Sequence, residues 1–152
     1  MSCENRGVAD KLYNYLCDSV AHTGYYRLNG IELTALGPGE AELSVLTGPQ
    51  HCNPMQVIHG GVYSTLVDAA MGNAIRSTGV IGVTCSMSVN FVAGAQQGEL
   101  LTAKGRVTRV GRSMIYAAAE LYCGEKVMAT AIGSFFRTGE IDFENTMGAG
   151  HR

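Results

Sequence analysis

One carboxylate, Asp68, lies in a predicted helix that opens with His59, Gly60 and Gly61. A carboxylate can act as a general base or as a nucleophile. The two glycines are poor helix formers, but in a first turn they leave backbone N–H groups unobstructed at the positive end of the helix dipole. A carbonyl oxygen that gains negative charge could dock there. This segment therefore combines a candidate base with a candidate oxyanion site.

Two faces of different composition predict that the helix runs over residues 59–76. Apolar side chains gather on one side of the helical wheel, and they are Val62, Tyr63, Leu66, Val67, Ala70 and Ala74. The other side has no Lys, Arg or Glu and consists of Gly61, Ser64, Thr65, Asp68 and Gly72. Such a face suits the close approach of a ligand or of another backbone.

Ordinary structural roles are also open for the two polar residues of this segment. Asp68 could be held by a neighbouring hydroxyl or could pack across a dimer, because a buried carboxylate must be paired or hydrogen-bonded. His59 could cap or pack at the start of the helix without taking part in chemistry. The spacing is compatible with these roles and with catalysis.

The segments before this helix predict a second helix and two strands. Residues 8–21 carry apolar side chains at a spacing of four, which is typical of a short helix. Between Tyr25 and Thr47, the turn Gly37-Pro38-Gly39 separates two strand-like runs. Residues 48–58 contain two prolines and no period, so we expect a loop.

Four strands are predicted after the helix. From Val83 to Phe91 apolar residues alternate with polar ones, which is typical of a half-buried strand. Further strands are expected over residues 101–110, 114–123 and 126–137. The joints are short and rich in turn residues, and short joints connect antiparallel neighbours. The second half is therefore expected to form a four-stranded meander.

Together these elements predict an α+β fold in which a curved antiparallel sheet wraps around one long central helix. We expect one domain over residues 25–138, a helical segment over 1–24 and a tail over 139–152 outside the core. Charged residues make up only 16% of the chain. Because a small domain with so few charges has apolar surface to cover, we expect a homo-oligomer.

Charge and hydropathy argue against several classes of partner. The net charge of -2 and the lack of a basic stripe predict no nucleic-acid partner. The basic residues that lie closest together in the sequence are Lys104, Arg106, Arg109 and Arg112. We interpret them as a solvated strand face, with a ligand site as the alternative. No apolar run approaches the length of a membrane span, and we expect neither a leader nor a membrane partner.

The cysteines and histidines predict free thiols and no metal site. The five cysteines are odd in number and form no Cys-x-x-Cys pair, which favours a reducing, cytoplasmic location. His51, Cys52 and His59 lack a fourth ligand, so we expect no bound metal. No predicted base stands beside Cys52, so it is not expected to act as a nucleophile.

Three strings of residues resemble the hotdog-fold acyl-CoA thioesterases. They are His51-Cys52-Asn53-Pro54, Val57-Ile58-His59-Gly60-Gly61 and Leu66-Val67-Asp68-Ala69-Ala70-Met71-Gly72. The similarity is to the branch that contains the phenylacetate-pathway thioesterase and thioesterase superfamily member 2, and it spans about Leu33 to Phe136. A lone His-Gly-Gly would be a weak signal, whereas these three strings followed by alternating strands are a strong one.

The resemblance implies a role for each polar residue of the motif. Asp68 matches the general base or nucleophile of thioester hydrolysis, and the N–H of Gly60 matches the donor that polarises the thioester carbonyl. Asn53 matches an amide that holds the water or the carbonyl, and His59 matches a positioning residue. Thr84 matches a hydroxyl that orients the attacking water in some members. In this branch the Asn and the acid come from opposite subunits, which implies active sites at a dimer interface. A tetramer built as a dimer of dimers is expected, and a dimer alone stays open as the alternative.

Coenzyme A enters this expectation as part of the substrate, so no separate cofactor is expected. The resemblance implies that Arg109, Gly111, Arg112 and Ser113 lie near the nucleotide and that Gly61 also contacts coenzyme A. Arginine suits this position because its guanidinium group binds phosphate through two parallel hydrogen bonds.

The resulting expectation is an acyl-CoA thioesterase that hydrolyses an acyl- or aryl-CoA thioester to the free acid and coenzyme A, with the acyl group open. One alternative is a hotdog dehydratase or hydratase, which pairs a catalytic histidine with an acid. The His-Gly-Gly helix start favours the thioesterase. The other alternative is a non-catalytic module that binds acyl-CoA without consuming it.

Overall fold

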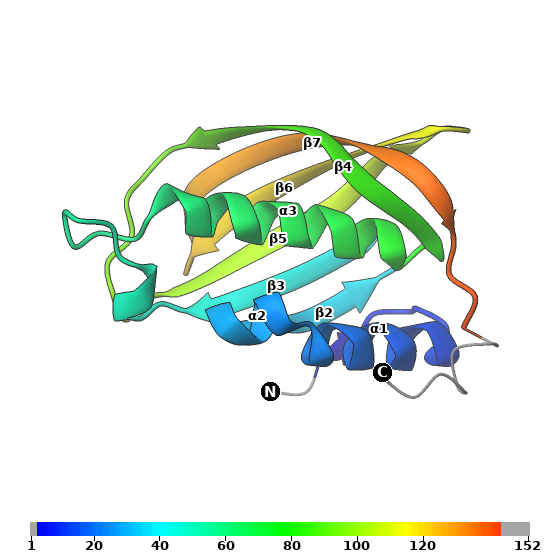
Figure 1. Cartoon of the computed structure of the whole chain (residues 1–152), viewed down its shortest axis with the longest axis horizontal. Helices are drawn as coiled ribbons and strands as arrows, with labels where there is room; N and C mark the ends of the chain where they lie inside the picture. The colour runs from blue at the N-terminus through cyan, green and yellow to red at the C-terminus, as the bar shows by residue number, and fades with distance from the viewer. Residues whose placement is uncertain (1–2, 144–152) are drawn as a thin grey trace.

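A curved, mostly antiparallel sheet wraps around the central helix α3 (Gly60–Arg76) in the computed structural model, which describes residues 3–143 (Figure 1). The strands are β1 (Glu4–Asn5), β2 (Ile31–Gly37), β3 (Glu40–Leu46), β4 (Val80–Phe91), β5 (Leu100–Val110), β6 (Met114–Cys123) and β7 (Lys126–Glu140). Their order across the sheet is β1-β2-β3-β5-β6-β7-β4. This arrangement confirms the predicted α+β class. Among the described residues, no helix has both the length and the apolar character needed to cross a membrane.

The apolar face of α3 lies against the sheet, as the helical wheel predicts. Leu66, Val67 and Ala70 are fully buried there. The middle of the helix comes so close to β5 that a Cβ atom on Gly105 would lie 2.3 Å from the carbonyl carbon of Ala70. Because no side chain fits in that space, Gly105 sets the depth at which α3 sits in the sheet. It thereby sets the height of Asp68 above the sheet.

Two helices precede β2, and the second replaces part of a predicted strand. Helix α1 (Asp10–His22) confirms the short helix expected there. Helix α2 (Gly24–Asn29) covers residues at which we expected the first strand to begin, so the strand starts only at Ile31. The expectation was wrong: the segment forms a short helix capped by Gly30, whose φ of 64° is the left-handed conformation of a helix C-cap. The hydroxyl of Tyr25 hydrogen-bonds to that of Thr65 on α3 at 2.9 Å.

The predicted terminal segments differ in how far the structure describes them. Val8, Leu16 and Val20 of the N-terminal segment pack into the same apolar core as the sheet. Strand β7 runs to Glu140, and Ile141 after it is buried. Most of the predicted tail, residues 144–152, lies outside the described residues, and the expected domain boundaries stay a prediction.

The hairpin and the loop before α3 form where they are predicted. Strands β2 and β3 are joined by Gly37-Pro38-Gly39, with Gly39 at a φ of 75°. The loop over residues 48–58 contains a short 3-10 helix, η1 (Pro49–His51). A bridge between Cys52 and Ile58 pairs the two ends of this loop. The chain is thereby returned to the start of α3.

The predicted four-stranded meander is wrong in its first step. Strands β5, β6 and β7 are consecutive neighbours, but β4 pairs with β7 at the outer edge of the sheet. The joint over residues 92–99 passes the ends of β7 and β6 instead of turning back. It is anchored on the way, because the N–H groups of Val92 and Ala93 donate to the carbonyl of Met128 and Ala95 is fully buried. A joint of this length can cross two strands, so its shortness does not imply neighbouring strands.

A β-bulge interrupts the predicted alternation in β4. Thr84 lies opposite Phe135 and Ser86 opposite Ser134, so Cys85 is an extra residue without a partner in β7. After the bulge, Met87 packs against the core, in agreement with the pattern. Before the bulge the two faces are exchanged, and Val83 is 55% exposed.

Candidate active site

The start of α3 holds one accessible backbone donor. His59 is the N-cap, and its Nδ1 accepts a hydrogen bond of 2.7 Å from the N–H of Gly61. The N–H of Gly60 has no protein acceptor within residues 3–143. The sequence led us to expect accessible N–H groups at both Gly60 and Gly61. Because that of Gly61 is bonded to His59, only the N–H of Gly60 can bind a ligand. His59 has the capping role that was left open, and this role leaves its Nε2 as the ring nitrogen that can donate.

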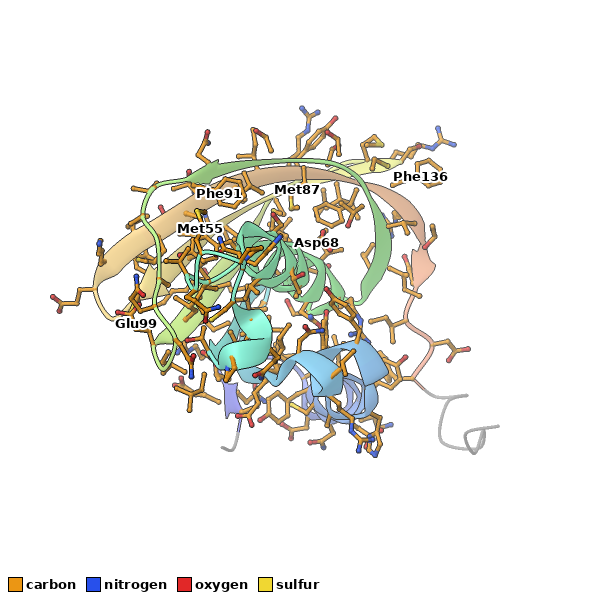
Figure 2. The ribbon with its side chains drawn as sticks, turned by 60° about the vertical axis from the view of Figure 1, so that its left-hand side comes forward. Met55, Asp68, Met87, Phe91, Glu99 and Phe136 are labelled. Atoms are coloured by element: carbon orange, nitrogen blue, oxygen red, sulfur yellow. The ribbon has the colours of Figure 1, made fainter. Side chains whose placement is uncertain are left out.

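An aromatic side chain that the motif analysis missed lies against Gly60. A Cβ atom on Gly60 would lie 3.2 Å from Cε1 of Phe91, at the end of β4 (Figure 2). The ring of Phe91 packs on Tyr63, with 6.0 Å between centroids, and the hydroxyl of Tyr63 donates to the carbonyl of Ala93 at 2.9 Å. The glycine is needed because these rings leave little room beside it. The only local signal for this wall is the aromatic residue that closes the alternating strand.

Asn53 shapes the loop before the helix with one end of its amide. Its Oδ1 accepts hydrogen bonds from the N–H groups of Met55 at 2.9 Å and Val57 at 3.3 Å. These bonds form an Asx-type turn. Because Oδ1 is occupied, Nδ2 is the part of the side chain that can donate to a ligand. Since the ends of the loop are paired, Asn53 is held at the same end of the molecule as His59 and Gly60.

His51 anchors this loop through both of its ring nitrogens. Its Nδ1 accepts from the N–H of Gly48 and its Nε2 donates to the carbonyl of Asn29, each at 2.9 Å. Both ring nitrogens are thus occupied in a buried position. Cys52 donates its thiol proton weakly to the carbonyl of Gly48. Within residues 3–143, no three His, Cys, Asp or Glu side chains are grouped to hold a metal.

Asp68 is paired with a hydroxyl from the edge strand. The Oγ1 of Thr84 donates a hydrogen bond of 2.8 Å to Oδ1 of Asp68. Figure 2 shows Asp68 on the side of α3 that turns toward β4. Thr84 reaches the acid because the bulge at Cys85 turns it toward α3, whereas uniform alternation placed it on the polar face away from the apolar side chains. The neighbouring-hydroxyl role that the sequence left open for Asp68 is therefore present, and it is compatible with a base that is held in position.

Gly60 and Asp68 are separated along the same helix. Eight residues at 1.5 Å per residue place them about 12 Å apart along the axis. A group that attacks a carbonyl and a donor that stabilises its oxygen both have to lie about 3 Å from the reacting atoms. One chain therefore brings Asn53 and His59 to Gly60, and Thr84 to Asp68. It does not bring the two groups to one carbonyl.

The turn implied for nucleotide binding lies at the other end of the molecule. In Figure 1 the β5–β6 turn is opposite the loop that precedes α3. The N–H of Gly111 donates to the carbonyl of Met114 at 2.8 Å, and the N–H of Arg137 donates to the carbonyl of Ser113 at 2.8 Å. The first bond closes the turn, and the second ties the turn to β7. Arg109 and Arg112 beside it are exposed. Within one chain they do not meet Gly61.

The other basic side chains of that group behave as a strand face. Lys104 lies 3.5 Å from the carboxylate of Glu42 on the neighbouring strand and stands over the ring of Tyr122 at 5.6 Å. Arg106 is exposed beside it. This agrees with the solvated strand face that was expected for Lys104 and Arg106.

A cavity of about 370 Å³ adjoins the start of α3. It is lined by α2, the loop and the first two turns of α3, including Tyr25, His59, Gly61 and Thr65. Tyr25 and Thr65, which both line it, are joined by the hydrogen bond described above. The motif did not indicate Tyr25, because the residue was assigned to a strand. The only signal for Thr65 is its place on the same small-residue face as Asp68.

Comparison with known proteins identifies the family. The thioesterase superfamily matches residues 55–130, half of the chain. A putative esterase of Pseudomonas aeruginosa is 36% identical over 89 residues, which cover 57% of this chain and 66% of that protein. The acyl-coenzyme A thioesterase PaaI of Escherichia coli is 27% identical over 111 residues, which cover 72% of this chain and 79% of that protein.

Two solved structures share the fold. The PaaI protein from the phenylacetic acid degradation operon of E. coli superposes with a TM-score of 0.82 at 23% identity, covering 88% of this chain and 98% of that one. Zebrafish thioesterase superfamily member 2 superposes with a TM-score of 0.72 at 25% identity, covering 81% and 93%. These findings confirm the predicted hotdog fold and the predicted branch. The chain belongs to the thioesterase superfamily and is a thioester hydrolase, as the pattern of Asn53, His59-Gly60-Gly61 and Asp68 predicted.

Proposed function

We propose that this protein hydrolyses acyl-CoA or aryl-CoA thioesters, with Asp68 as general base or nucleophile and the N–H of Gly60 as oxyanion donor. The observation that carries the proposal is the pair of half-sites on one helix. One half is an acid held by the hydroxyl of Thr84, and the other is a helix start with one unoccupied N–H. The name of the E. coli relative supplies the substrate class.

The two half-sites would meet when two copies pair. The separation of about 12 Å between Gly60 and Asp68 along α3 favours a site that takes its acid from one copy and its donor from the other. The small-residue face of α3 would allow close approach of the second copy. Strand β4 supports the same geometry, because a long and largely exposed edge strand is a natural place for a second chain to pair. Asn53 would belong to the same copy as the donor.

In this arrangement each group has one step to perform. The oxygen of Thr84, whose proton points at Asp68, accepts a hydrogen bond from the attacking water. Asp68 takes a proton from that water, and the hydroxide attacks the thioester carbon. The N–H of the second copy's Gly60 stabilises the resulting oxyanion, with Nδ2 of Asn53 as a second donor. Collapse of the intermediate breaks the carbon–sulfur bond and releases the thiolate of coenzyme A, which is a good leaving group at neutral pH because thiols ionise near pH 8.5.

The substrate would span the interface. The cavity beside Tyr25 and Thr65 would receive the acyl group, because it opens next to the Gly60 end of α3. The nucleotide would lie at the exposed turn of Arg109 and Arg112, from the copy that supplies Asp68. Gly111 and Ser113 would keep that turn tight. His59 and Gly61 would hold the helix start in shape through their mutual hydrogen bond.

A second interface would join dimers into the expected tetramer. The outer face of β6 and β7 exposes large side chains, among them Tyr116, Ile132 and Phe136. Such a contiguous apolar surface favours burial against another dimer. The cytoplasmic location stays a prediction from the thiols, and the structure shows all five cysteines as free.

The test is an assay of thiol release over a panel of short-chain, medium-chain and aryl-CoA esters. Asp68→Asn is expected to lower kcat by at least about 100-fold for every ester. Asp10→Asn, the same change at an exposed acid in α1, serves as the matched control and should leave the rate unchanged. Near-normal turnover by Asp68→Asn would overturn the assignment.

The two alternative functions give different results in the same samples. A binding module would bind acyl-CoA in calorimetry without releasing thiol. A hydratase would change the absorbance of an enoyl-CoA ester and leave its thioester intact.

A further inference from the structure

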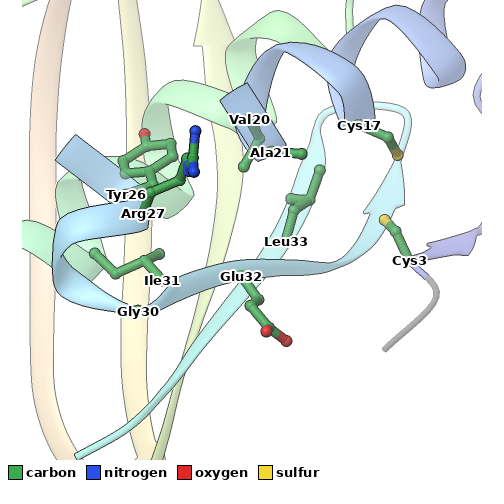
Figure 3. Close-up of a pocket in the computed structure, with 10 residues that line it drawn as sticks. All are labelled: Cys3, Cys17, Val20, Ala21, Tyr26, Arg27, Gly30, Ile31, Glu32 and Leu33. Atoms are coloured by element: carbon green, nitrogen blue, oxygen red, sulfur yellow. The ribbon is translucent and has the colours of Figure 1, made fainter. Parts of the chain in front are cut away.

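Two thiols that the thioesterase site does not use lie together at the N-terminal end of the chain. Cys3 comes just before β1, and Cys17 follows the buried Leu16 on α1. Figure 3 shows their sulfur atoms facing one another at one end of a cavity. Both side chains are partly buried against the core. The pair therefore joins two elements that are separate in the sequence.

The surroundings hold Cys3 in this position. The hydroxyl of Tyr13, one turn before Cys17, donates a hydrogen bond to the backbone carbonyl of Cys3. Burial, followed by the neighbouring thiol of Cys17, raises the pKa of Cys3 to about 11. Cys3 is consequently a neutral thiol at physiological pH, packed against a second thiol.

A small reagent can reach the pair from the cavity. This space has a volume of about 540 Å³ and lies between α1, α2 and β2. Both thiols line it, together with apolar side chains such as Val20 and Leu33. The other three cysteines, at positions 52, 85 and 123, are not among its lining residues.

We propose that Cys3 and Cys17 form a reversible intramolecular disulfide, made by exchange with a low-molecular-weight disulfide such as oxidised glutathione. One protein thiol loses its proton and attacks a sulfur of the reagent, which breaks the reagent's S–S bond and releases one molecule of reduced thiol. The second protein thiol then attacks the mixed disulfide and releases the other. The two cysteines are oxidised by two electrons, and the reagent is reduced by two.

The disulfide would link the first strand covalently to α1. Strand β1 pairs with β2 through only two residues, Glu4 and Asn5. The new bond would close a loop of about 15 residues, which restricts the unfolded chain. It would also connect β1 to α1, whose Ser19 accepts a hydrogen bond of 2.8 Å from Arg76 at the end of α3. We expect the melting temperature to rise by about 5 °C or more on oxidation.

The test equilibrates the full chain in glutathione buffers of graded potential, followed by alkylation of free thiols and tryptic mass mapping. Trypsin cuts after Arg6 and Lys11, between the two cysteines, so the disulfide would link two separate peptides. The expected result is this linked pair in wild type, a matching rise in melting temperature and reversal of both by dithiothreitol. Cys3→Ser and Cys17→Ser should each abolish both changes.

Cys123→Ser is the matched control, because it removes a partly buried thiol elsewhere in the chain. It should keep the linked peptides and the rise in melting temperature. The proposal is overturned if Cys3 and Cys17 are still reduced, and therefore alkylated, at potentials at which the exposed Cys85 already carries glutathione. It is also overturned if the only cross-link joins two chains on a non-reducing gel. Either result leaves the thioesterase assignment untouched, since activity is measured separately.

Discussion

The hydroxyl of Thr84 on β4 donates a hydrogen bond of 2.8 Å to the carboxylate of Asp68 on α3. This contact joins the edge strand to the helix at the proposed base. It fixes Oδ1, and within residues 3–143 Oδ2 has no hydrogen-bond donor, so Oδ2 can face a water molecule. Because the donor lies on a strand and the acceptor on a helix, the hydrogen bond holds the acid in one orientation.

Removing this hydroxyl is expected to affect turnover more than binding. Thr84→Val keeps the β-branched shape but lacks the donor, and kcat should fall about 10- to 100-fold with KM changed by less than about threefold. Thr84→Ser, which keeps the hydroxyl, should retain most of the rate. Steady-state kinetics on one acyl-CoA ester checks both variants, and equal rates for Val and Ser would contradict a role in orienting water.

Adding a methyl group at Gly60 is expected to displace the oxyanion donor. The new Cβ would lie 3.2 Å from Cε1 of Phe91, so the first turn of α3 must shift. A displacement of this kind should lower kcat/KM about 10- to 100-fold in Gly60→Ala. Phe91→Leu in the same chain relieves the contact and should restore part of the rate.

The matched control for this change is Gly24→Ala at the first residue of α2. A Cβ atom there meets nothing within 4 Å, so the rate should not change. Failure of Phe91→Leu to rescue any activity would indicate that the loss at Gly60 does not come from this contact.

Mixed dimers test whether one site draws on two chains. Asp68→Asn and Asn53→Ala homodimers should both be nearly inactive. In a mixed dimer one of the two sites has both residues intact, so an equimolar mixture that exchanges freely should regain about a quarter of the wild-type rate. The measurement is thiol release before and after subunits are exchanged in mild denaturant. No recovery after verified exchange would place Asp68 and Asn53 in the same chain's site.

The raised pKa of Cys3 predicts how stability depends on alkaline pH. In the unfolded chain this thiol ionises near its ordinary pKa of 9.0, whereas burial raises its pKa to about 11 in the folded chain. Between these values the unfolded state has lost a proton that the folded state keeps, so the free energy of unfolding falls as pH rises. The contribution is complete below about pH 9 and is lost by about pH 11.

Urea denaturation of the reduced protein between pH 8 and 11 measures this effect. The free energy of unfolding should fall more steeply in wild type than in Cys3→Ser. Cys85→Ser serves as the control because Cys85 is exposed. Parallel curves for wild type and Cys3→Ser would contradict a raised pKa of Cys3 in the folded chain.

Local sequence was sufficient to predict the central helix. The two faces of residues 59–76 follow from helical periodicity, and the burial of Leu66, Val67 and Ala70 agrees with it. The Gly37-Pro38-Gly39 turn needs a backbone conformation that favours glycine, so it too is visible locally. The spacing of Asn53, His59-Gly60-Gly61 and Asp68, followed by the alternating strands, indicated the family, which the comparisons confirm.

The pairing of strands that are distant in the sequence could not be predicted from local patterns. Strand β4 could satisfy its hydrogen bonds with β5 or with β7, and nothing within either strand distinguishes the two. The choice depends on how the 92–99 joint is anchored, through Met128 and the buried Ala95. The contact between Tyr25 of α2 and Thr65 of α3, 40 positions apart in the sequence, was likewise not visible locally.

Asp68 of the proposed site illustrates what the sequence determines and what only the tertiary structure decides. The sequence by itself determined that Asp68 lies on a small-residue face of a helix that begins with two glycines, because the 3.6-residue period places it there. Only the tertiary structure decided that Thr84 faces this acid, because a bulge at Cys85 reverses the side-chain alternation of β4. A period of two cannot reveal an inserted residue, since the bulge is defined by the partner strand and not by the strand that carries it.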